Sequence, residues 1–408
     1  MKTESGEVLS NSVMYVLLLA LSMMFLTPVM RHAIQVSIDY ENHYLRAMEL
    51  PAQTTNRAVG HVLYHAVVKV VRALLPAASN LDVQLISVLS FMLPLPAMIH
   101  LLLKRSAGGA LPDLFIGALA LGLTFASPVT VWANNKFMMG YINPIVYHNP
   151  TLIALRLFVI PLSLLALLAV KERDYRDRNQ RVFWLLAAAS VIMLTTLSKP
   201  SYTIALLPAV VLFAIWRRLR MGKGGDFVFI LLGLCIPGGI VLALEYLYTF
   251  ASGFQHGGPI AFGPLRFMTA WIPLWRVPIQ FALSLVFPVG VCLLYVDAAR
   301  KCQYLKLCWI VFAVGALYLL TLYQEGPGFR SGNFLWTAYS AMFVLMFASL
   351  KFLIEQHKRE RETQDLETRR AGPRLSHRVS VGFALFALHV LSGFAYWYRF
   401  LIYPWSAG

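Results

Sequence analysis

Charged residues are scarce in this chain: they make up 13% of its 408 residues, whereas hydrophobic residues make up 58%. Cysteine is scarce as well, and its four positions have no spacing typical of a metal site or a disulfide framework. The sequence also lacks an ATP-binding motif, an internal repeat and the alternating strand pattern of outer-membrane proteins. With a mean hydropathy of +0.64, this composition is typical of a helical protein that lies in a membrane.

Apolar runs recur along the chain at the length needed to cross a bilayer, about 20 residues each. We therefore predict an all-α, polytopic transmembrane bundle of about eleven spans with outer juxtamembrane helices. For the two short runs on either side of "SKPS", a re-entrant hairpin is the alternative. The predicted spans lie near residues 13–30, 83–103, 111–133, 150–170, 182–198, 201–216, 227–250, 278–297, 305–323, 334–354 and 379–402.

The first run gives no sign of a signal peptide. It extends from Val13 to Met30 and ends at Arg31 without a small-residue cleavage motif, so we expect a retained helix. We treat residues 1–408 as a single integral-membrane domain without a large soluble domain. Within it, we expect residues 31–82 to form a first outer loop with juxtamembrane helices and residues 355–378 to form a cytoplasmic charged linker.

The net charge of +16 comes from Lys and Arg residues in the loops between apolar runs. This distribution is typical of membrane-orientation signals, and it argues against a basic stripe that binds nucleic acid. If the N-terminus is cytoplasmic, the inside loops carry about twice as many basic residues as the outside segments. We therefore expect a cytoplasmic N-terminus and a C-terminus on the outside.

Aromatic residues, Gly, Pro, Asn and His concentrate in the predicted outside loops, so we look for chemistry there. The first such stretch is "SIDYENHYLRAMEL", residues 37–50. Helical spacing would place Asp39, His43 and Arg46 on one face. The alternative is an interfacial helix whose charges only face water.

A second outside stretch, residues 56–76, contains His61 and His65 at a spacing that places them on one side of an amphipathic helix. Two histidines at this spacing could be metal ligands, but no third ligand is evident nearby. Anchoring and hydrogen bonding are therefore favoured for this pair.

Two further loops place polar residues at the ends of predicted spans. In "NNKFMMGYINPIVYHNPT", Asn149 precedes Pro150 and is expected to cap the next helix, while His148 has no structural explanation. In "LSKPSY", Lys199 lies between two apolar runs. Its ammonium either extends to the interface or forms a cation at headgroup depth that could meet a lipid phosphate.

The loop "YQEGPGFRSGNFLW", residues 323–336, is polar and rich in glycine. Arg330 and the backbone N–H groups of the following helix could hold an anion there. A pair between Glu325 and Arg330 is the structural alternative. Two ionisable residues within predicted spans, Arg156 and Glu245, are functional candidates by default, unless they pair with each other.

The order of these motifs resembles a known superfamily. The segments "DYENHYLRA", "GHVLYHAVVKVVRALLP", "YHNPT", "SKPSY" and "GPGFRSGNFLW" are similar in layout to bacterial multi-spanning proteins of the GT-C superfamily of glycosyltransferases. The resemblance covers most of the chain. It implies a GT-C fold, a bacterial inner-membrane location and an inverting transfer of sugar from a polyprenyl-phosphate carrier at the periplasmic face, in the synthesis of surface polysaccharide or glycolipid.

The resemblance also implies roles for individual residues. Members of the superfamily share a catalytic carboxylate in the first outer loop, which corresponds to Asp39 here, with Glu41 as the rival. Such a carboxylate accepts the proton of the attacking hydroxyl. The leaving lipid phosphate gains negative charge, which nearby cations would stabilise. The predicted substrate-binding residues are Lys199 and Arg330, with His43, His61, His65, His148, Asn149, Glu325 and Asn333 as polar partners.

The expected partners are a lipid-linked sugar donor, a glycan or lipid acceptor, membrane lipid and other polysaccharide-synthesis proteins. No cofactor is expected, and a divalent metal is not favoured because the outside segments contain few acidic residues. Three other functions are kept as alternatives: a transporter or flippase of lipid-linked saccharide, a polymerase or ligase of another type, and a non-catalytic subunit of a synthesis and export complex.

Overall fold

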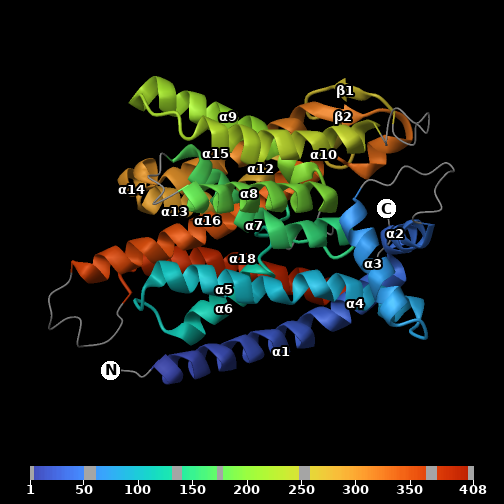
Figure 1. Ribbon diagram of the computed structural model, residues 1–408, viewed down its shortest axis with the longest axis horizontal. Coiled ribbons are helices and arrows are strands. Elements are labelled where there is room, and N and C mark those ends of the chain that lie inside the picture. The colour runs from blue at the N-terminus through green and yellow to red at the C-terminus, as the bar shows by residue number, and fades with distance from the viewer. Residues whose placement is uncertain are drawn as a thin grey trace.

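The protein is a bundle of helices, most of which run along its long axis (Figure 1). The computed structural model describes residues 4–49, 61–130, 140–171, 178–247, 258–363 and 375–402. Within these ranges, nine helices are long and apolar enough to cross a membrane, or ten if one bent pair counts as a single span. The chain is therefore a multi-pass helical membrane protein, with fewer candidate spans than the eleven that the sequence predicted.

The candidate spans are formed by α1 (Glu4–Val36), α4 and α5 (Asn80–Met92 and Pro94–Ala107), α7 (Pro150–Val170), α8 (Arg178–Ser198), α9 (Ser201–Met221), the π-helix η1 with α10 (Phe229–Cys235 and Ile236–Tyr246), α15 (Gln303–Thr321), α16 (Leu335–Glu362) and α18 (His377–Ile402). The shorter elements are α2 (Ile38–Glu49), α3 (Val62–Leu74), α6 (Asp113–Leu123), β1 (Ile260–Phe262), α11 (Arg266–Thr269), α12 (Arg276–Ser284), α13 (Val286–Leu294), α14 (Val296–Lys301), β2 (Leu322–Gln324) and the 3₁₀-helix η3 (Gly326–Ser331). The strands β1 and β2 pair antiparallel.

Two predicted spans differ from the structure, and one alternative considered from the sequence is not needed. The span expected at 111–133 contains α6, which has 11 residues and is shorter than the roughly 20 needed to cross a bilayer. The span expected at 278–297 is broken into α12 and α13, which are bent by 61°. The short runs beside "SKPS" belong to α8 and α9, each of 21 residues, so both are long enough to span.

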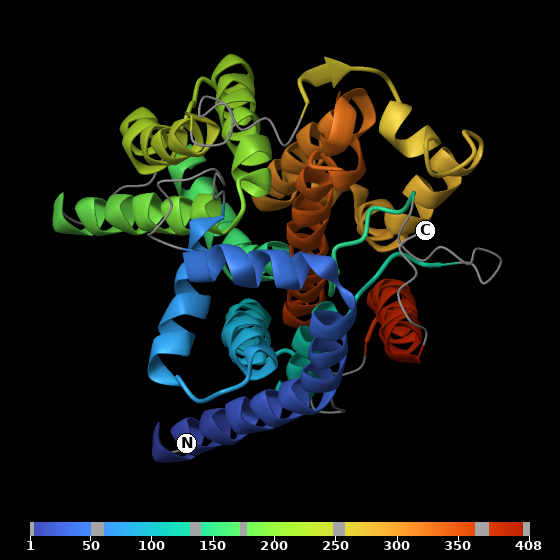
Figure 2. The ribbon, with the colours of Figure 1, turned by 90° about the vertical axis from the view of Figure 1, so that its right-hand side faces the viewer.

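The helix α16 lies at the centre of the bundle (Figure 2), and all its residues from Trp336 to Leu350 are buried. Lipid tails are as apolar as leucine, so membrane helices associate through close packing and hydrogen bonds. Here Gly315 of α15 allows the backbone around Thr337 to approach closely. The Thr337 hydroxyl donates to the Gly315 carbonyl at 3.1 Å. The remaining candidate spans surround this central helix.

The extended chain at residues 126–130 is held by α18 and α13. Nδ1 of His389 lies 2.7 Å from the carbonyl oxygen of Ser127, and its Nε2 accepts the N–H of Phe287 at 3.2 Å. The Ser127 N–H donates in return to the His389 carbonyl at 3.0 Å. Non-helical backbone inside a membrane protein requires such partners. One histidine thus joins three segments that are distant in the sequence.

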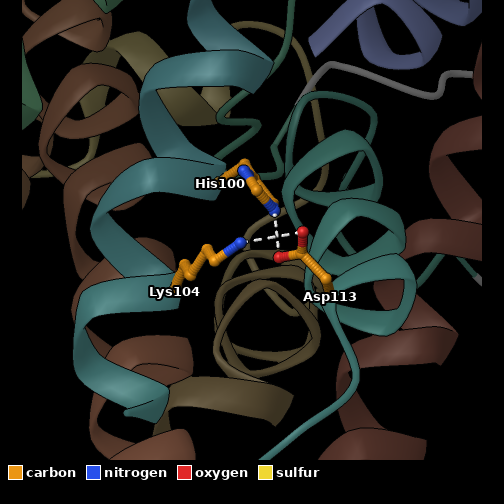
Figure 3. A network of polar contacts seen from close by, with 3 residues as sticks. All are labelled: His100, Lys104 and Asp113. Carbon is orange, nitrogen blue, oxygen red and sulfur yellow. Dashed lines mark hydrogen bonds and ion pairs between the residues drawn. The ribbon is translucent and has the colours of Figure 1, made fainter. Parts of the chain in front are cut away.

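The helices α2 and α3 lie together at one end of the bundle, which we call the α2–α3 end; the N-terminus lies at the opposite end (Figure 1). At that opposite end, α5 and α6 are joined by a polar network. Asp113 accepts from Lys104 at 2.9 Å and lies 2.9 Å from Nε2 of His100 (Figure 3). The His100 side chain is fully buried, whereas that of Asp113 is 24% exposed. Asp113 therefore bonds two residues of α5 from the first turn of α6.

We expect Asp113→Asn to destabilise the protein by about 1–3 kcal/mol, because the amide keeps one acceptor oxygen in place of two and loses the negative charge beside Lys104. The measurement is thermal unfolding of the purified protein in detergent. Asp82→Asn is the matched control, since Asp82 lies in the first turn of α4 and bonds only its own exposed cap residue, Ser79. Equal midpoints for the two variants would show that the network does not stabilise the α5–α6 pair.

Candidate functional site

Helix α2 is fixed onto the loop that precedes α7. The hydroxyl of Ser37 donates to the carbonyl oxygen of His148 at 3.2 Å. One turn later, the Tyr40 hydroxyl donates to the carbonyl oxygen of Tyr147, also at 3.2 Å. These two bonds place the N-terminal part of α2 beside the start of α7, although the two segments are more than 100 residues apart. The predicted site residues of both segments therefore meet at the α2–α3 end.

Lys199 is buried at the junction of α8 and α9, with only 4% of its surface exposed. Its ammonium donates to the hydroxyl of Thr151 at 3.2 Å and lies 5.4 Å from the centre of the Trp336 ring. A lysine that only extended to the interface would be exposed, so burial argues against that reading of "LSKPSY". Burial lowers the pKa of Lys199 to about 8, while the carboxylates of Asp39 and Glu245 act in the opposite direction.

The Asn149 side chain bonds both the start of α7 and the hydroxyl that contacts Lys199. Its side chain caps α7 by accepting the N–H of Leu152 at 2.9 Å, as the "NPT" motif predicted. The same oxygen accepts the hydroxyl of Thr151 at 2.9 Å. Because that hydroxyl is thereby oriented, its lone pairs face the Lys199 ammonium. The helix cap and the buried cation are thus parts of one hydrogen-bond chain.

The two carboxylates in the first turn of α2 lie in different environments. Asp39 is half-buried and within electrostatic range of Lys199, whereas Glu41 is exposed. Burial raises the pKa of Asp39 above its usual value, and the nearby charges of Lys199 and Arg46 partly offset this effect. Successive helix residues are about 100° apart, so a spacing of two turns Glu41 to the opposite side. Asp39 is therefore the first-turn carboxylate of α2 that lies within electrostatic range of the buried cation.

Three histidines line the space between α2 and α3. Nδ1 of His43 lies 2.8 Å from Nε2 of His65, and the rings of His43 and His61 are 6.3 Å apart. Burial, followed by nearby cationic residues, lowers the pKa of all three, that of His65 to about 4. They are neutral near pH 7, so one ring N–H donates to the other ring. In the described ranges, no three His, Cys, Asp or Glu side chains converge as metal ligands would.

His148 also lies within electrostatic range of the Lys199 ammonium. Its ring is 5.8 Å from that of Trp336, which Lys199 also approaches. Burial lowers the pKa of His148 to about 4, and the positive charges of Lys199 and Arg156 contribute further. Trp336 thus contacts two predicted site residues. The sequence analysis did not select it, although it ends the motif "GPGFRSGNFLW".

Glu245, near the end of α10, contacts the site through the backbone N–H of His61. Its carboxylate accepts the N–H of His61 at 3.4 Å. His61 has a positive φ of 71°, which is uncommon outside glycine, and it begins α3 in this left-handed conformation. In the part of the chain that the structure describes, no contact joins Glu245 to Arg156, whose guanidinium lies 5.9 Å from the Phe343 ring. The pair considered from the sequence is therefore not formed.

The predicted residues of the 323–336 loop lie outside this cluster. Arg330 is exposed on η3, and Glu325 is exposed beside β2, where the Tyr323 hydroxyl contacts it at 3.5 Å. The amide of Asn333 donates to Gln324 at 2.6 Å, a local bond within the loop. None of the described contacts connects these side chains with Asp39 or Lys199. The motif reaches the site only through Trp336.

A cavity of about 950 Å³ lies elsewhere, beside the bent helices α12 and α13. Its lining comes from these helices, from residues on either side of α11, and from α15 and α18, and none of the lining side chains is charged. None of the predicted site residues lines it. It has room for a lipid chain but no cation for a phosphate, so we do not place the candidate chemistry there.

The comparison with known proteins does not identify a family. No protein-family model matches the chain, and no curated protein is significantly similar to it. Any function therefore has to be argued from the site at the α2–α3 end.

Removing the Lys199 charge should raise the pKa of Asp39, because the ammonium favours the ionised carboxylate. We expect the protonated carboxyl of Asp39 to persist to higher pH in Lys199→Met than in the wild type. Infrared difference spectra recorded against Asp39→Asn isolate this carboxyl during a pH titration. Lys69→Met, at a half-buried position on α3, is the control. An unchanged Asp39 titration in Lys199→Met would show that the two groups do not interact.

Proposed function

We propose that the protein is a GT-C-type glycosyltransferase of the bacterial inner membrane that takes sugar from a polyprenyl-phosphate-linked donor at the periplasmic face. One observation carries the proposal: a half-buried carboxylate, Asp39, lies within electrostatic range of a buried ammonium, Lys199, at the end of the bundle where α2 and α3 lie. A base for the acceptor and a cation for the leaving group are the two charges that glycosyl transfer to a hydroxyl needs.

In the proposed reaction, the acceptor hydroxyl oxygen attacks the anomeric carbon of the donor sugar while its proton passes to Asp39. The bond between the anomeric carbon and the phosphate oxygen breaks, and its electron pair stays on the lipid phosphate. Lys199 stabilises the negative charge that develops there. Attack opposite the leaving group inverts the configuration at the anomeric carbon.

The surroundings of the two residues suit these roles. Burial strengthens the interaction between the ammonium and an anion, because little water screens it. The neutral histidines can donate hydrogen bonds to sugar hydroxyls or accept hydrogen bonds from them. Because they carry no positive charge, they do not compete with Lys199 for the phosphate. A raised pKa makes Asp39 a better base than an ordinary carboxylate. We assign these roles to residues at the α2–α3 end and not to Arg330, which is exposed.

The first test is transfer of labelled sugar from a polyprenyl-linked donor in reconstituted membranes. We expect Asp39→Asn to lower the rate by about 10²–10⁴-fold, the usual contribution of a general base. Glu41→Gln is the matched control: it removes an exposed carboxylate from the same helix and should leave the rate within about twofold. If Glu41→Gln lost activity and Asp39→Asn did not, the base would be assigned to the wrong residue.

The second test is the dependence of the transfer rate on pH. Asp39 must be ionised and Lys199 protonated, so the rate should rise through the pKa of Asp39 and fall as pH passes about 8, the pKa of Lys199. Arginine stays protonated at any accessible pH. Lys199→Arg should therefore move the alkaline limb to higher pH, whatever its maximal rate. A limb that did not move would exclude Lys199 as its cause.

A further inference from the structure

Arg156 is a second buried cation near the site, and the proposed mechanism does not use it. It lies on α7, is 3% exposed and contacts the Phe343 ring through its guanidinium. Among the described residues, no hydrogen-bond partner satisfies its Nη2 atom. The phenols of Tyr147, Tyr396 and Tyr40 lie within electrostatic range of the Arg156 guanidinium, and among the described residues no carboxylate does. A buried guanidinium without a counter-ion in a membrane helix marks a functional site by default.

The phenols beside Arg156 offer hydrogen bonds to the same space. The hydroxyl of Tyr147 is buried, and within the described ranges it has no partner either. Its ring is stacked on that of Tyr396 at 5.3 Å, which fixes its position. The guanidinium of Arg156 and the phenol of Tyr147 therefore both have hydrogen-bond donors without an acceptor among the described residues. This arrangement favours binding of an oxyanion, which accepts several hydrogen bonds at once.

The position of Arg156 connects it with Lys199. Lys199 contacts Thr151, which is five residues before Arg156, or roughly 7.5 Å along the axis of α7. Helical side chains lean towards the N-terminus of their helix, so Arg156 leans towards the end where Thr151 lies. His148 is within electrostatic range of both cations. Both positive charges therefore act on the region around His148.

We propose that Arg156 and Tyr147 form a second oxyanion position, and that Lys199 and Arg156 together hold the diphosphate of a lipid carrier. The inference rests on the proposed function and narrows its substrate class from lipid phosphates in general to lipid diphosphates. Lys199 binds the phosphate that is bonded to the sugar, and Arg156 binds the phosphate that is bonded to the lipid. A monophosphate would leave one of the two buried cations without a counter-ion.

The test is a binding measurement on the full-length protein in nanodiscs, with inorganic phosphate, inorganic pyrophosphate, and a polyprenyl monophosphate and diphosphate of equal chain length as probes. We expect the wild type to prefer the lipid diphosphate to the lipid monophosphate by about tenfold or more, because the second phosphate gains a charged partner. Arg156→Gln should lose this preference and keep its affinity for the monophosphate. Tyr147→Phe should weaken the diphosphate alone.

Arg217→Gln is the matched control, because Arg217 is also buried and has unpaired guanidinium atoms, but lies near the other end of α9. It should bind all four probes as the wild type does. A folded Arg156→Gln that keeps the diphosphate preference overturns the proposal. If Arg156→Gln does not fold, an unchanged preference in Tyr147→Phe overturns it. Equal affinity for inorganic pyrophosphate and the lipid diphosphate overturns the assignment to a lipid carrier.

The binding measurement involves no sugar transfer, so the two proposals can fail separately. A diphosphate preference that depends on Arg156, in a protein that transfers no sugar, would overturn the proposed glycosyltransferase alone. Sugar transfer that depends on Asp39, from a monophosphate and a diphosphate donor with equal efficiency, would overturn only the second oxyanion position.

Discussion

The burial of the Lys199 ammonium is the constraint on which the candidate site depends. A buried cation must be surrounded by groups that replace water, and these groups come from many parts of the chain. The Thr151 hydroxyl comes from the start of α7, the Trp336 ring from α16, and the negative charges of Asp39 and Glu245 from α2 and α10. Asp39 is held within electrostatic range of this ammonium because the Ser37 and Tyr40 hydroxyls fix α2 to the loop before α7.

The two ends of the bundle differ in how their cations are paired. At the end opposite α2 and α3, Lys104 with Asp113 and Arg181 with Asp226 form direct ion pairs, whereas the buried Arg217 keeps guanidinium atoms that are unpaired among the described residues. At the α2–α3 end, Lys199 and Arg156 are more deeply buried, and within the described ranges neither contacts a carboxylate directly. Direct pairing is what a structural role requires. Buried cations that lack it fit a ligand that brings negative charge, which is why both proposals concern this end.

Several features of this end were predictable from short stretches of sequence. Asn149 before Pro150 predicted a helix cap, and the structure has it. The amphipathic pattern around His65 predicted the helix that the structure places at Val62–Leu74. By contrast, Arg330 looked as suitable for an anion as Lys199, yet it is exposed and Lys199 is buried. Both are single basic residues in polar loops, and nothing in either loop indicates which one other helices will cover.

The sequence by itself determined the class of the protein, the position of most helices and the local caps, because hydropathy and capping depend on neighbouring residues. Only the tertiary structure decided that Asp39 is half-buried within electrostatic range of Lys199 while Glu41 is exposed, that the span expected at 278–297 is bent, and that Trp336 contacts both Lys199 and His148. These outcomes depend on contacts between segments far apart in the chain, such as that of Ser37 with His148. A pattern within one segment does not contain them.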